Sequence, residues 1–193
     1  MSSVTEIYNM ALGRLGAKRV NADTSSTPEA VICREYYEHT RKLLLRSFRW
    51  PFARKDAVLS EDTTTPVLDY DHAYIMPPDY LRLLTVNEQD ATDPLDNRWT
   101  IKGNRLQTNY DTCSITYIRD VTVVNDFDVL FSELLALTLA KKIAPAIVGT
   151  KSPALMDDLY RDLKEANLKA RTVCLEEINT TGRDNWNLAR FGG

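Results

Sequence analysis

The chain has 193 residues, of which 44% are hydrophobic, so it suits one domain, or one domain with an insertion, that buries a core without disulfides or metals. It carries 24 Lys and Arg against 27 Asp and Glu, a formal net charge of -3. A dedicated nucleic-acid binder usually has an overall excess of basic residues, and this chain has none. A local basic patch is still compatible with the net charge.

The N-terminal part of the chain predicts two helices. Ser3 and Glu6 match a capping box, and apolar residues follow at helical spacing as far as Gly16, where we expect the first helix to end. A polar loop leads to Thr27, which can cap a second helix with Pro28 at its first position. The second helix is amphipathic, and its apolar stripe consists of Cys33, Tyr37, Thr40, Leu44 and Phe48.

The second helix leads into a segment rich in aromatic residues. Pro51 disfavours helical geometry at Trp50, so we expect the helix to end there and a second module to begin. We interpret Phe48, Trp50, Pro51 and Phe52 as a hinge between modules. Its aromatic rings are expected to pack the helices against the β module that follows.

Basic side chains surround this hinge and predict a rim that faces DNA or a partner protein. Residues 41–55 include no Asp or Glu, and their basic members are Arg41, Lys42, Arg46, Arg49, Arg54 and Lys55. A structural interpretation stays open beside this one, because long basic side chains often run along apolar surface with only the charge in water.

Residues 51–125 predict a small antiparallel β domain. Short runs of β-branched and aromatic residues are separated there by Pro, Asp, Thr and Asn. The stretch Lys-Gly-Asn-Arg at 102–105 predicts a hairpin turn between strands at 98–102 and 105–108. Alternating apolar and polar residues at 113–121 predict a further strand.

Two more helices are expected after the β domain. Residues 127–148 are apolar nearly all round as far as Ala140, which is typical of a central helix covered on several sides. Pro145 should kink or end that helix. The next helix is expected to begin at Ser152 and to continue to about Asn179.

The predicted fold class is α+β. An antiparallel four-helix bundle is expected to form from both chain ends, residues 1–50 and 126–178, with the β domain of residues 51–125 inserted between them. Residues 179–193 are predicted to form an extended C-terminal tail that is too polar for a core of its own. We expect its anchor residues to form a partner interface: Trp186, Leu188, Arg190 and Phe191.

The sequence contains no recognisable catalytic, cofactor-binding or metal-binding motif. Neither His39 nor His72 has Cys or His at metal-ligand spacing. The phosphate-binding loop, the dinucleotide fingerprint, the nucleophile elbow and the HExxH motif are all absent, and no carboxylate pair stands out as catalytic. We therefore predict a non-enzymatic protein that needs no cofactor and no metal.

Cysteine usage and hydropathy predict a soluble intracellular product. The chain has an odd number of cysteines, which lie far apart in the sequence: Cys33, Cys113 and Cys174. We therefore interpret them as buried thiols in a reducing compartment. The N-terminus lacks the pattern of a secretory signal, and the most apolar run, residues 129–148, is interrupted by charges and proline. No membrane insertion is expected.

Several segments together carry a family resemblance. They are Ala-Leu-Gly-Arg-Leu-Gly at 11–16, Pro-Glu-Ala at 28–30, Trp-Pro-Phe-Ala at 50–53, Tyr-Ile-Met-Pro-Pro-Asp-Tyr-Leu-Arg at 74–82, Trp99 with Gly103 and Leu106, Ile-Thr-Tyr-Ile-Arg-Asp at 115–120, and the helix at 131–140. In this order the chain resembles, over roughly residues 4–178, the tail tubular protein A family of short-tailed bacteriophages. Members of that family are head-to-tail adaptors, or connectors.

The resemblance implies a virion structural protein without enzymatic activity. It implies a dodecameric ring beneath the portal, joined to the portal protein and to the next tail component, a nozzle or tail tube. Genomic DNA would pass through the lumen without sequence-specific contact during DNA ejection. The protein would be made in the host cytoplasm and would lie at the head-tail junction of the virion.

Two alternative functions stay open. One is a tail-associated peptidoglycan-degrading enzyme, for which the sequence offers no recognisable acid and nucleophile pair. The other is a local DNA-binding module that rests on residues 41–55 alone. Its binding would weaken steeply as the salt concentration rises, because counterions are released when phosphates are neutralised.

Overall fold

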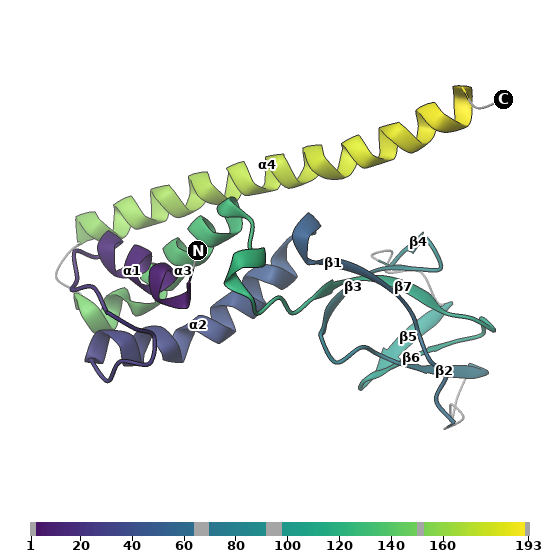
Figure 1. The fold of residues 1–193 in the computed structure, drawn as a ribbon, viewed down its shortest axis with the longest axis horizontal. Helices are drawn as coiled ribbons and strands as arrows, with labels where there is room; N and C mark the ends of the chain where they lie inside the picture. The colour runs from purple at the N-terminus through teal and green to yellow at the C-terminus, as the bar shows by residue number, and fades with distance from the viewer. Residues whose placement is uncertain (1–2, 64–69, 92–97, 150–152, 192–193) are drawn as a thin grey trace. The chain divides into compact units, whose positions relative to one another are not determined.

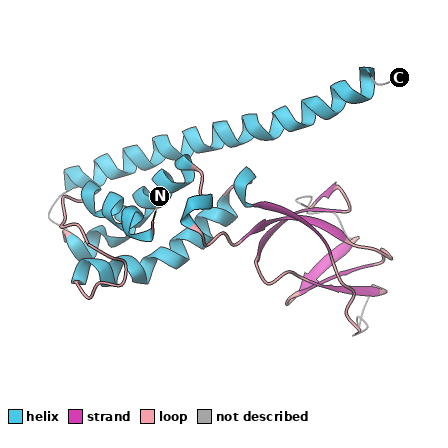
Figure 2. Cartoon of the chain, in the orientation of Figure 1, coloured by secondary structure: helices cyan, strands magenta, loops and turns pink. Residues whose placement is uncertain are grey.

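The computed structural model describes the backbone of residues 3–63, 70–91, 98–149 and 153–191, and side chains as far as residue 178. Backbone contacts divide the chain into two compact units. The helical unit comprises Met1–Phe52 and Val121–Gly193, and the β unit comprises Ala53–Asp120. Figure 2 shows the corresponding division between helices and strands.

The described residues form four α-helices, whose bounds are α1 Val4–Arg14, α2 Pro28–Ser47, α3 Val129–Ile147 and α4 Pro153–Phe191. Short 3-10 turns, η1 (Pro51–Ala53) and η2 (Val124–Asp126), precede β1 and α3.

Side-chain caps fix the starts of three helices. The backbone N–H of Glu6 donates to Ser3 Oγ, and that of Ala30 donates to Thr27 Oγ1, as the sequence predicts. The cap of α3 is Asp128, whose Oδ1 accepts from the backbone N–H of Leu130 at 2.7 Å. A carboxylate at this position satisfies backbone donors that the helix itself leaves without partners.

Helix α3 is the centre of the helical unit. Its buried side chains point in several directions and include Phe131, Leu134, Leu135, Leu137, Leu139 and Ile143. Each of the other three helices packs against α3, whereas α1 and α2 make few contacts with each other. Figure 1 shows α1, α2 and α4 placed around α3.

The prediction of an antiparallel four-helix bundle formed by both chain ends with an inserted β domain is therefore wrong. The fold is α+β with helices gathered around α3 and with two antiparallel sheets. In a four-helix bundle each helix turns one apolar stripe toward a shared core. An apolar surface nearly all round α3 instead demands cover on several sides, which places that helix inside the others.

The ends of α3 and α4 differ in detail from the sequence analysis. Pro145 lies inside α3, which ends two residues later at Ile147, before Gly149 with φ of 68°. Helix α4 continues beyond Asn179 as far as Phe191. Once a helix is nucleated, each added residue gains a backbone hydrogen bond, so a polar composition alone does not end it.

The β unit contains two antiparallel sheets. The first has the strand order β1-β7-β3-β4 and the second β2-β6-β5. The strand bounds are β1 Arg54–Val58, β2 His72–Ile75, β3 Tyr80–Val86, β4 Gln89–Asp90, β5 Trp99–Lys102, β6 Arg105–Thr108 and β7 Ser114–Arg119. The predicted hairpin is confirmed, because Lys102 pairs with Arg105 across a turn in which Gly103 has φ of 63°.

Both sheets contribute to one core of the β unit. Tyr74 comes from β2 and Leu106 from β6, whereas Leu83, Ile115 and Tyr117 come from β3 and β7. Figure 1 shows the strands of the two sheets close to one another. Each sheet can thus bury one face against the other, as in other packed pairs of sheets. None of the helices in the described part of the chain combines the length and apolar character that a membrane crossing needs.

Candidate functional site

The predicted hinge is an aromatic cluster inside the helical unit. Trp50 is 1% exposed, and its ring centroid lies 5.1 Å from that of Phe48 and 5.1 Å from that of Phe131 on α3. Phe52 also contacts Phe131, with the centroids 5.2 Å apart. The indole Nε1 donates to the carbonyl of Leu44 at 2.9 Å.

Within the helical unit, this segment packs against α3. The rings of Trp50 and Phe52 meet Phe131 on α3, and the ring of Phe48 lies against Trp50. The expected packing against the β module stays a prediction. Pro51 begins η1, so the chain turns directly after the buried indole. The segment therefore anchors the end of α2 to α3.

Arg41 does not face outward. It is 4% exposed, and its guanidinium donates to the carbonyl of Val121, a residue that is itself fully buried. This bond ties α2 to the segment that returns from the β unit. A buried charge needs such a partner, because desolvation is otherwise strongly unfavourable.

The other basic residues of the predicted rim lie on different elements, and the rim itself stays a prediction. Lys42 pairs with Glu38 on the same helix at 2.6 Å. Arg46 and Arg49 lie near the end of α2, are less buried than Arg41 and also interact with neighbouring groups. Arg54 and Lys55 lie on β1 of the other unit, where both are exposed.

Lys55 belongs to a polar cluster in the β unit. Its Nζ lies 3.0 Å from Asp79 Oδ2, and the hydroxyl of Tyr117 donates to Asp79 Oδ1 at 2.7 Å. Burial alone would raise the pKa of Asp79, but the hydrogen bonds from Tyr117 and Lys55 outweigh it and lower that pKa. Burial and the bond to Asp79 raise the pKa of Tyr117. The cluster holds the turn before β3 against β7.

The predicted interface residues at the C-terminus are Trp186, Leu188, Arg190 and Phe191. Their backbone lies in α4, but their side chains lie outside the described residues. The interface therefore stays a prediction.

A histidine between two carboxylates is a feature that the sequence analysis did not identify. His72 Nδ1 lies 2.7 Å from Glu61 Oε1, and Nε2 lies 3.5 Å from Asp111 Oδ1. The hydrogen bond to Glu61 raises the pKa of His72. The three residues come from separate segments, so no motif spacing signals them. The group joins two loops of the β unit to β2.

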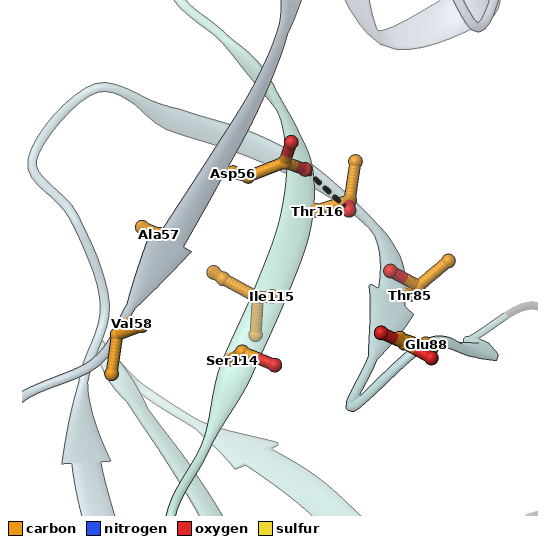
Figure 3. A pocket seen from close by; sticks show the side chains of 8 residues that line it. All are labelled: Asp56, Ala57, Val58, Thr85, Glu88, Ser114, Ile115 and Thr116. Atoms are coloured by element: carbon orange, nitrogen blue, oxygen red, sulfur yellow. Dashed lines mark hydrogen bonds between the residues drawn. The ribbon is translucent and has the colours of Figure 1, made fainter.

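The β unit also has a shallow trough of about 500 Å³ on the face of its four-stranded sheet. Figure 3 shows Asp56 on β1 bonded to Thr116 on β7, with Thr85, Glu88 and Ser114 nearby. Within the described residues β1 is an edge strand, paired only with β7 along its length. Edge strands of this kind can accept a further strand.

A smaller groove of about 300 Å³ lies between α1 and α3. Met10 and Val129 line it and are 40% and 79% exposed. Arg14 lies at its margin and contacts Glu133 on α3 at 3.7 Å and Asp162 on α4 at 3.0 Å. The groove could take an apolar side chain of a partner.

The described residues include no group of three or more His, Cys, Asp or Glu placed to hold a metal ion. Cys33, Cys113 and Cys174 are free and buried, and burial raises the pKa of each thiol to about 11. Such thiols are poor nucleophiles at neutral pH.

Comparison with protein-family models and with curated proteins yields no significant match to this chain.

Proposed function

We propose that the chain is a virion structural protein of a short-tailed bacteriophage, a head-to-tail adaptor that forms a ring beneath the portal. In this role it joins the portal protein to the next tail component, and genomic DNA passes through the ring. The protein is non-enzymatic and acts through its surfaces. The proposal rests on the resemblance to the tail tubular protein A family described above.

One observation supports the proposal beyond the sequence pattern. Two of the segments that carry the resemblance, 74–82 and 115–120, are bonded to each other through Asp79. Its carboxylate accepts from the Tyr117 hydroxyl at 2.7 Å, and its carbonyl accepts from the backbone N–H of Asp120 at 2.7 Å. The two segments that resemble the family in sequence are thus hydrogen-bonded to each other in the structure, as expected if they are inherited as one β unit.

The direct test is reconstitution with the portal. The purified full chain is mixed with the portal ring from the same genome, and the mixture is imaged by negative-stain electron microscopy beside the portal alone. The expected result is an added tier with the rotational symmetry of the portal. A portal that stays bare at every protein concentration would overturn the adaptor proposal.

The C-terminal residues provide a second arm of this test. Replacing Trp186 and Phe191 with alanine should weaken portal binding, because a few aromatic anchors commonly dominate interface energy. A matched control replaces the polar neighbours Thr180 and Thr181 with alanine. If the aromatic variant binds the portal as well as the control does, the portal contact lies elsewhere on the chain.

A further inference from the structure

The helical unit exposes two separate apolar surfaces. The first is the groove of about 300 Å³ between α1 and α3, where Met10 and Val129 are 40% and 79% exposed. The second lies on α4, where Leu168 and Leu175 are 58% and 57% exposed. Side chains seven positions apart on a helix point in nearly the same direction, so these two leucines form one line along α4, the leucine stripe.

The leucine stripe points away from α3. Helix α4 packs along α3 (Figure 1), and its side chains Leu159 and Ala170 are almost fully buried. At about 100° per residue, both lie about 160–180° around the helix from Leu168. The groove is on α3 itself, so the two surfaces do not overlap and one copy of the chain can use both at once.

The groove and the stripe match in size. Leu168 and Leu175 are about 10 Å apart along the helix axis, at 1.5 Å per residue. Residues 6–14 of α1 and 129–137 of α3 line the groove, a length of about 12 Å on each helix. An apolar cavity of about 150 Å³ holds benzene, so a groove of twice that volume has room for two leucine side chains.

The groove is acidic, whereas the surface around Leu168 is basic. The charged residues of the groove and its margin are Glu6, Arg14, Glu133 and Asp162. Three carboxylates and one guanidinium give a net charge of -2. Residues 164–172 of α4 include three basic side chains and one acidic side chain, all exposed: Lys164, Lys169, Arg171 and Glu165. Their net charge of +2 complements that of the groove.

The two ends of the groove differ. Arg14 marks one end, because it bonds to Asp162 on α4 at 3.0 Å. Near Asp162, the ring of Tyr160 lies under Lys141 of α3, so Arg14 is level with the C-terminal half of α3. The start of α1, with Glu6, therefore lies toward the start of α3.

We propose that the leucine stripe of one copy of this chain fills the groove of a second copy. Glu6 is exposed and forms no ion pair with any residue that the structure describes. Leu168 therefore takes the Glu6 end of the groove, where Lys164 reaches the free carboxylate, and Leu175 takes the Arg14 end. Because two different surfaces meet, the contact repeats from copy to copy and can close into a ring.

This inference rests on the self-association in the proposed function, and disulfide trapping tests the contact itself. Val129→Cys and Leu168→Cys are made in separate full chains, which are mixed under mild oxidation with and without the portal ring. The native thiols are buried and react slowly. A disulfide-linked heterodimer is expected, whereas Val129→Cys mixed with Leu43→Cys, at an exposed leucine of α2, should give none.

Two results would overturn the inference. One is the absence of the heterodimer both with and without the portal. The other is an equal yield of dimer from the Leu168→Cys chain alone, which would indicate a two-fold contact between identical stripes. The portal experiment uses the wild-type chain, so the two failures are distinguishable: an added tier without the cross-link refutes this contact only, and a cross-link beside a bare portal refutes the adaptor proposal only.

The charge contact is tested by reversal and rescue. Glu6→Lys in the Val129→Cys chain and Lys164→Glu in the Leu168→Cys chain should each slow the cross-linking about fivefold, since each replaces attraction by repulsion. Mixing the two altered chains should restore the rate. Glu29→Lys, at a first-turn glutamate of α2, is the matched control, and circular dichroism checks that all variants keep their helices. Unchanged rates in the single variants, or no rescue in the mixture, overturn the inference.

Discussion

Substitution of Arg41 by methionine separates a structural role from a DNA-binding role for this residue. Methionine keeps most of the apolar stem but cannot donate to the carbonyl of Val121. Val121 is fully buried, so water cannot replace the hydrogen bond that its carbonyl loses in this variant. A hydrogen bond from a charged group contributes about 1.5–3 kcal/mol, so we expect a loss of about 2 kcal/mol in the free energy of unfolding.

The measurement is urea-induced unfolding of the full chain, followed by circular dichroism. Lys42→Met is the matched control, because Lys42 makes a solvent-exposed pair with Glu38, and such pairs contribute less than about 1 kcal/mol. A mobility-shift titration at low salt is run on the same proteins. If Arg41→Met unfolds like wild type but loses DNA binding, the structural assignment is wrong and Arg41 acts on nucleic acid.

Three further predictions concern contacts within the helical unit or within the β unit. Trp50→Ala should lower the free energy of unfolding by about 3–5 kcal/mol, since it removes a buried ring at the centre of the aromatic cluster; a loss below 1 kcal/mol in the same urea titration would contradict this. The pKa of Asp79 is lowered because its hydrogen bonds outweigh the effect of burial, so its contribution to stability is present above the unfolded pKa of about 3.9 and is lost as the pH falls through the folded value. Asp79→Asn should therefore be less stable at pH 7 and should lose less stability on acidification than wild type, as followed by thermal unfolding across pH. The pKa of His72 is raised by its bond to Glu61, so its contribution is complete below about pH 6.5 and is lost as the pH rises through the folded pKa. In an NMR titration Glu61→Gln should bring the pKa of His72 back toward its ordinary value, and an unchanged pKa would show that another group holds the proton.

The sequence was most informative where the signal is local. The caps at Ser3 and Thr27 and the hairpin at 102–105 depend on residues within one or two turns of chain, and the structure has each of them. Such signals can be read from spacing, because the interacting groups are close in the sequence as well as in space.

The basic segment was harder to interpret from the sequence. On a helical wheel Arg41 lies off the apolar stripe, which indicates an exposed side chain. The structure buries it because Val121, 80 positions away along the chain, supplies a carbonyl acceptor. Likewise, the sequence does not show that His72 lies between two carboxylates, because these come from two other loops.

The sequence by itself determined the four helices, apart from the end of α4, and the strands that correspond to β5, β6 and β7, because caps, turns and periodicity act within a few residues. The apolar pattern also indicated that α3 is a central helix, but only the tertiary structure decided that α1 and α2 pack against α3 more than against each other, and which charged groups are buried. The physical reason is that burial depends on partners from distant segments. A pattern of apolar residues specifies which faces need cover but leaves open which segments provide it.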